Sequence, residues 1–114
     1  MKHKMRLNDE PFYKIKDGTK TIEMRLFDEK RKAINLGDEI EFSRQKNESE
    51  KIKTKVIALH RFNSFKDLYE NLDIIKCGYS ESEKEKVSYT DMEEYYPKEK
   101  QEQYGVVGIE IERI

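Results

Sequence analysis

The sequence has few of the residues that build disulfides, metal sites and membrane spans. Cys77 is its only cysteine, which excludes an internal disulfide and a metal site of several cysteines and is typical of a reducing cytoplasm. His3 and His60 lie far apart in the chain, so we expect neither a metal nor a cofactor. No apolar run approaches the ~20 residues that span a bilayer, and no signal-peptide pattern follows Met1. We therefore expect a cytoplasmic protein without a membrane segment.

The chain also lacks an excess of either charge. Lys and Arg number 23 and Asp and Glu number 24, and the resulting net charge of −1 excludes a globally basic nucleic-acid-binding protein. Seven tyrosines and five phenylalanines argue against a disordered chain. The length fits one domain over residues 1–114, and we favour a monomer.

The opposite charges cancel between regions of the chain. Residues 1–32 carry ten basic and six acidic side chains, whereas residues 81–103 carry four basic and eight acidic ones. A locally basic first third can attract phosphate even when the whole protein is neutral. Two alternatives stay open: ordinary solvated surface, and a protein-interaction role for the acidic 81–103 region.

Hydrophobic periodicity predicts an α+β protein in which strands dominate. Helices are expected at residues 9–17, closed by Gly18, and after Ser64, with shorter helical pieces near residues 91–96 and 98–103. Strands are expected at residues 3–7, 21–27, 39–43, 51–61 and 107–112, with a polar loop at residues 44–50. This order is satisfied by a small mixed or antiparallel β-barrel with flanking short helices.

The segment from Lys20 to residue 26 holds the densest candidate chemistry. Apolar residues at 22, 24 and 26 alternate with polar ones, so Glu23 and Arg25 share the polar face of a half-buried strand, about 7 Å apart. Arg can donate two parallel hydrogen bonds to a phosphate or a base, and Glu can accept from an amine, orient the Arg or act as acid or base. The alternative is an exposed Glu–Arg ion pair worth under about 1 kcal/mol.

Aromatic and lysine side chains supply further candidates. Four phenylalanines are expected to fill the core, namely Phe12, Phe42, Phe62 and Phe65. Tyr79, Tyr89 and Tyr96 lie nearer polar loops and are better candidates for stacking on a base. A lysine stripe at residues 51, 53 and 55 could either follow a phosphate backbone or protect an edge strand.

Several short motifs are similar to one known family. They are Arg6-Leu7, Pro11-Phe12, Gly18-x-Lys20-Thr21-x-Glu23-x-Arg25-Leu26, Gly37-Asp38-x-Ile40-x-Phe42 and the closing Tyr104–Ile109 segment. Together they resemble the ASCH domain family over most of the chain. ASCH domains are similar to PUA domains, which are small β-barrels with flanking helices and a cleft between them. The resemblance implies an RNA- or nucleoside-binding protein whose cleft is lined by Lys20, Glu23 and Arg25, with Tyr79 and Tyr96 as further ligand contacts.

The same resemblance leaves an enzyme open. Some members are hydrolases, including an amidohydrolase that acts on N4-acetylcytidine and a ribonuclease. The amidohydrolase branch has a Thr nucleophile where this chain has Glu23, and a carboxylate cannot simply replace a hydroxyl activated by a neighbouring Lys. The partner acid of that branch precedes a Tyr-Pro step, and Glu81 is the match, with Glu83 or Glu85 as alternatives. A hydrolase of nucleosides or RNA would therefore use Lys20, Glu23 and Glu81.

Overall fold

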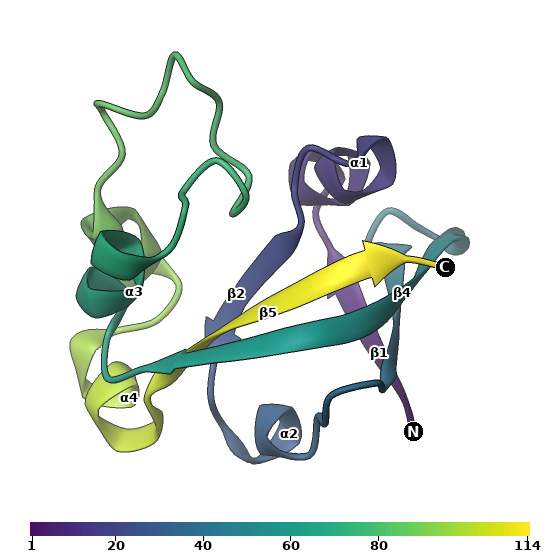
Figure 1. Ribbon diagram of the computed structural model, residues 1–114, viewed down its shortest axis with the longest axis horizontal. Coiled ribbons are helices and arrows are strands. Elements are labelled where there is room, and N and C mark those ends of the chain that lie inside the picture. Colours follow the sequence, from purple (N-terminus) through teal and green to yellow (C-terminus); the bar gives the residue numbers. More distant parts are fainter.

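Five β-strands form one mixed sheet that curls into a half-barrel (Figure 1). The computed structural model describes all residues from 1 to 114. The strand order is β1-β3-β4-β5-β2, in which only β1 and β3 run parallel. The strands are β1 (Lys2–Leu7), β2 (Ile22–Leu26), β3 (Glu39–Arg44), β4 (Asn47–Phe62) and β5 (Val106–Arg113). The two edge strands, β1 and β2, therefore border the open seam of the half-barrel.

Short helices cover the ends and one side of the sheet. α1 (Asp9–Asp17) and α2 (Glu29–Lys32) lie at opposite ends of β2, whereas α3 (Phe65–Asn71) and α4 (Lys98–Tyr104) lie together beside it (Figure 1). A 3₁₀ helix, η1 (Tyr89–Glu94), precedes α4. Gly18 ends α1 as predicted, with a φ of 88° and its N–H bonded to the Ile15 carbonyl. Ser64 caps α3 by accepting from the Asp67 N–H.

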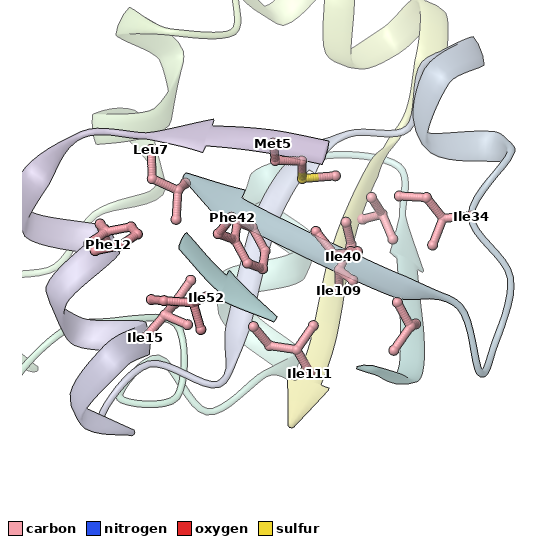
Figure 2. Packing of buried hydrophobic residues seen from close by; sticks show 12 residues of the cluster. Met5, Leu7, Phe12, Ile15, Ile34, Ile40, Phe42, Ile52, Ile109 and Ile111 are labelled. Atoms are coloured by element: carbon pink, nitrogen blue, oxygen red, sulfur yellow. The ribbon is translucent and has the colours of Figure 1, made fainter. Parts of the chain in front are cut away.

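The main hydrophobic core fills the concave side of the sheet. Figure 2 shows side chains from β1, β3, β4 and β5 converging with those of α1. Three of the phenylalanines expected in the core, Phe12, Phe42 and Phe65, are fully buried, whereas Phe62 is only partly buried. The alternation seen in the sequence thus places one face of each strand inside, as predicted.

A second, smaller core lies between β2, β5 and α3. It contains Ile22 and Met24 from β2, Phe65 and Leu68 from α3, Cys77 and Val106. Gly108 makes this contact possible, because a Cβ there would lie 2.8 Å from Leu72 Cδ1 and 3.1 Å from Ile22 Cγ2. The apolar face of β2 therefore packs against α3 and not against the main core.

One prediction about β4 is wrong. Residues 47–50 belong to β4, and only Gln45 and Lys46 form the turn that joins it to β3, so the expected loop at residues 44–50 is absent. This end of β4 is exposed on both faces, so no apolar alternation marked it as a strand. β5 pairs with β4 only from Thr54 onward, so Lys51 lies where β4 pairs with β3 alone and its other edge is free, as one of the two alternatives expected. The stripe also faces carboxylates of β3, with Lys51 Nζ 3.3 Å from a Glu41 oxygen.

No helix in the structure has the length and apolar character needed to span a bilayer.

Candidate functional site

β2 and the residues just before it position the three charged residues singled out from the sequence. It pairs with β5 so that Glu23 lies beside Ile109 and Arg25 beside Val107, whose side chains belong to the main core. The polar face of β2 therefore points into the half-barrel, at its seam. The prediction of a half-buried strand is wrong on this point, because both faces are covered: Glu23 is only 5% exposed and Lys20 only 7%. An exposed ion pair is excluded as well.

Lys20, Glu23 and Arg25 form a continuous ionic cluster. Lys20 Nζ lies 3.0 Å from one carboxylate oxygen of Glu23, and Arg25 Nε lies 2.9 Å from the other. Both cations also donate to main-chain carbonyls: Lys20 to Cys77 at 3.1 Å and Arg25 to Arg6 of β1 at 3.3 Å. The cluster therefore ties β2 to the segment around Cys77 at one end and to the opposite edge strand at the other.

The electrostatic balance keeps Glu23 ionised. Burial disfavours the charged carboxylate, but the adjacent Lys20 and Arg25 outweigh it, and the pKa of Glu23 is lowered. The pKa of Arg25 is raised, because its attraction to Glu23 exceeds the cost of its own burial. A carboxylate with a lowered pKa and two cationic partners is a weak base, so Glu23 is better suited to holding Lys20 in place than to accepting a proton.

A pocket of about 200 Å³ opens next to this cluster. It lies between α1, the start of β2 and the segment at residues 77–83, and it is lined by Glu10, Pro11, Lys14, Lys20, Met24, Cys77, Gly78, Tyr79 and Glu83. Lys20 connects the two features, because it belongs to both the pocket wall and the ionic cluster. Glu23 and Arg25 lie behind the wall and do not line the pocket.

Each of the two pocket lysines retains one N–H without a protein acceptor. A lysine ammonium has three donors. Those of Lys20 reach Glu23 and the Cys77 carbonyl, and those of Lys14 reach Glu10 at 3.0 Å and the Gly78 carbonyl at 2.5 Å. The pocket therefore presents two partly satisfied cations beside the two carboxylates of Glu10 and Glu83.

The other predicted site residues are dispersed. Tyr79 lines the pocket, and its hydroxyl lies 2.8 Å from that of Tyr69. Tyr96 stacks on Phe65 with ring centroids 5.6 Å apart and does not line the pocket. It lies near the ionic cluster, because burial raises the pKa of Tyr96 and the nearby Arg25 opposes this shift. The side chain of Glu81 is exposed and makes no hydrogen bond or ion pair, so the structure does not bring it to Lys20. Glu83, two residues later, is the acid that reaches the pocket.

Sequence reasoning missed the contributions of Lys14 and Gly78. Lys14 lies on α1, 64 residues from the carbonyl that it contacts, and no periodic pattern records such a contact. Gly78 has a φ of 112°, and a Cβ there would lie 3.2 Å from Lys20 Cδ, so glycine leaves room for the lysine. In the sequence, the glycine that follows Cys77 was the one available signal for a positive φ at this position.

The histidines and the cysteine lie elsewhere or are inert. His60 pairs with Glu110 and His3 with Asp38, at 2.9 and 2.8 Å. Burial raises the pKa of the Cys77 thiol to about 11, although Lys20 opposes this shift. No three His, Cys, Asp or Glu side chains are grouped so that they could hold a metal ion.

A small curled sheet with helices across its ends and a charged cluster at its seam is the architecture of a PUA-like domain. The ASCH domain family model matches residues 5–114, and the chain belongs to this family, whose members are broadly RNA-binding. The hypothetical protein PH0355, known from a crystal structure, has 39% sequence identity to this chain. The comparison covers 100% of both chains, with a TM-score of 0.81. The solution structure of protein PF0455 from Pyrococcus furiosus is 33% identical, with a TM-score of 0.68 over 100% of this chain and 98% of that one. No curated protein matches the chain.

Proposed function

We propose that this protein binds single-stranded RNA by holding one unpaired nucleoside in the pocket beside Lys20. The observation that carries the proposal is the placement of Lys20. Its ammonium is buried and fixed by Glu23 and the Cys77 carbonyl, yet one of its donors remains available at the pocket wall. A buried cation held in one position is suited to recognising a polar atom of a ligand, because its geometry is fixed before binding.

The dimensions and lining of the pocket favour a nucleobase. Pockets for drug-sized ligands usually measure about 300–1,000 Å³, so a volume of about 200 Å³ suits a single base with the ribose and phosphate outside. Tyr79 and Met24 provide apolar contact, whereas Lys14, Lys20 and the two carboxylates provide polar contacts. This combination of an aromatic ring and fixed polar groups is typical of proteins that bind splayed-out bases.

A hydrolase is less favoured by the same geometry. An amidohydrolase or ribonuclease at this site would need a free nucleophile or base, but both oxygens of Glu23 are engaged by cations and its pKa is lowered. Glu81 lies away from the pocket. The ionic cluster therefore supports a role in binding, with Glu23 as the group that positions Lys20.

The proposal is tested by measuring the affinity of labelled single-stranded RNA for matched lysine variants. Lys20→Met and Lys14→Met keep the length of the side chain and remove its charge, and Lys53→Met does the same at an exposed position of β4 outside the pocket. A lost hydrogen bond to a charged group costs about 1.5–3 kcal/mol, so each pocket variant should bind about 10- to 100-fold more weakly. Lys53→Met should bind like the unmodified protein.

Thermal unfolding monitored by circular dichroism verifies that each variant is folded. The proposal fails if both pocket variants are folded and bind RNA as tightly as Lys53→Met does, or if the unmodified protein does not bind single-stranded RNA. Incubation with N4-acylated cytidines and with RNA tests the enzymatic alternative. Product that forms with the unmodified protein and not with Glu23→Gln would replace the binding proposal by a hydrolase.

A further inference from the structure

We propose that the main-chain N–H and C=O of Met24 recognise the base in this pocket, and that the base carries a keto oxygen beside a ring N–H, as uracil and guanine do. The proposal rests on the nucleoside-binding function above and adds the chemical class of the base. It follows from the hydrogen-bond register of β2, from the burial of its free edge and from the donor that Lys20 retains.

The register of β2 and β5 fixes which main-chain groups of β2 are used. Ile111 N–H donates to the Thr21 carbonyl and Phe27 N–H to the Gly105 carbonyl, both at 2.9 Å. In an antiparallel pair, every second residue exchanges main-chain hydrogen bonds with the partner strand. The main-chain N–H and C=O groups of Glu23 and Arg25 therefore also point toward β5. The N–H and C=O of Ile22, Met24 and Leu26 therefore point toward the free edge of the sheet.

Only the beginning of this free edge is covered by another part of the main chain. The Lys76 carbonyl accepts from the N–H groups of Thr21 and Ile22, both at 2.9 Å. Beyond this point no loop, turn or cap hydrogen bond reaches the main chain of Met24. The pocket opens at this place, because Cys77, Gly78 and Met24 all line it.

The burial of Met24 decides what kind of ligand can reach these groups. A buried main-chain N–H or C=O without a hydrogen-bond partner costs free energy unless a ligand or a water molecule supplies the missing hydrogen bond. Met24 is only 7% exposed, so there is no room for an added β-strand along this edge, which would need several exposed residues in a row. A planar base that enters through the pocket can present one donor and one acceptor to a single residue.

The third donor of Lys20 determines the class of base. Adenine and cytosine could satisfy Met24 with an amino group and a ring nitrogen, but that ring nitrogen has one lone pair and could not also accept from Lys20. A keto oxygen has two lone pairs and can accept from both Lys20 and the Met24 N–H, while the neighbouring ring N–H donates to the Met24 carbonyl. Uracil and guanine share this edge, and the remaining groups of the pocket would distinguish them.

The experiment uses ¹⁵N-labelled protein and short single-stranded oligonucleotides of one base type. With uridine or guanosine oligonucleotides we expect the Met24 amide proton to shift downfield, whereas the Phe27 amide, which is bonded to the Gly105 carbonyl, serves as an internal control. Methylation of the ring N–H, in N3-methyluridine or N1-methylguanosine, should weaken binding at least about tenfold, because it removes the donor for Met24. C5-methyluridine, whose methyl group lies on another edge, should bind like uridine.

The outcomes separate this inference from the proposed function. If RNA binds and Lys20→Met weakens it, but the Met24 amide does not shift, the inference is overturned and the proposed function stands. Equal affinity for N3-methyluridine and C5-methyluridine, or a preference for adenosine or cytidine, also overturns it. If the lysine variants bind as tightly as the unmodified protein, both proposals fall together.

Discussion

At the scale of single residues, both carboxylate oxygens of Glu23 are held by a cation. It is a buried carboxylate between two cations, and each of these also holds a carbonyl of another segment. Such a cluster contributes little net stability over an apolar replacement, but losing one member leaves the others buried and unpaired. Glu23 therefore determines where Lys20 and Arg25 lie, whether or not a ligand is bound.

Glu23→Ala should destabilise the protein strongly. It leaves Lys20 and Arg25 without their shared carboxylate, and breaking a buried ion pair in this way costs about 3–5 kcal/mol. The measurement is the free energy of unfolding from urea titration. Glu29→Ala is the matched control, because the side chain of Glu29 is 86% exposed and its pair with Lys32 is worth under about 1 kcal/mol. Equal stability of the two variants would contradict the role assigned to Glu23.

Asp38 gives a pH-dependent prediction at the same scale. A hydrogen bond from His3 at 2.8 Å and one from the Asn35 N–H at 2.9 Å lower the pKa of Asp38 from 3.8 to about 2. The folded-state pKa lies below the unfolded one, so the stabilisation is complete above about pH 4 and is lost as the pH falls through about 2.

The measurement for Asp38 is a ¹³C carboxyl NMR titration of the folded protein. Its midpoint should lie near 2, and His3→Leu should raise it toward 3.8, because the largest stabilising hydrogen bond is then absent. His60→Leu removes a histidine that pairs with Glu110 instead and should leave the midpoint unchanged. A midpoint that does not respond to His3→Leu would show that His3 is not responsible for the lowered pKa.

At the scale of elements, the strands and helices were largely predictable because their periodicity is local. α1 lies at the predicted residues, and the alternation in β2 correctly separated its two faces. Alternation does not say what covers each face, so the polar face was expected to be solvated, although it lies at the seam of the half-barrel. The start of β4 is exposed on both faces, so no apolar alternation marked it as a strand and it was missed.

The segment that carries Gly78 should be sensitive to an added methyl group. In Gly78→Ala the side chain must accept a φ of 112° and a contact of 3.2 Å with Lys20 Cδ, so we expect a loss of about 2–3 kcal/mol and weaker RNA binding. Gly18→Ala is the control, because its φ is 88° but nothing lies within 4 Å of the new Cβ. It should cost about 1 kcal/mol and leave binding unchanged. Equal effects of the two variants on RNA binding would contradict the role of Gly78 in shaping the pocket.

At the scale of the whole molecule, the charges are arranged for local contact and not for a broad electrostatic field. The net charge is −1, and the lysine stripe of β4 faces the carboxylates of β3. Because acidic and basic side chains balance, the molecule as a whole does not attract a phosphate backbone. Recognition should depend mainly on the base, with a small contribution from phosphates near Lys14.

The salt dependence of RNA binding tests this arrangement. Each neutralised phosphate of single-stranded RNA contributes about −0.7 to the slope of log K against log salt, so two or three contacts predict a slope no steeper than about −2. Fluorescence anisotropy over a range of salt concentrations measures it. A slope of about −4 or steeper would mean that an extended basic surface binds the backbone. Lys53→Met should leave the slope unchanged.

The sequence by itself determined the family, the mixed fold with short helices and the three charges of the ionic cluster, because motifs and periodicity are properties of neighbouring residues. Only the tertiary structure decided that Glu23 and Arg25 lie behind the pocket and that Lys20 reaches into it. It also placed Lys14 and Glu83 in the lining of the pocket, and Glu81 and Tyr96 outside it. The physical reason is that the pocket forms where α1 and the segment after Cys77 meet the free edge of β2, and a contact between segments about 60 residues apart leaves no local pattern.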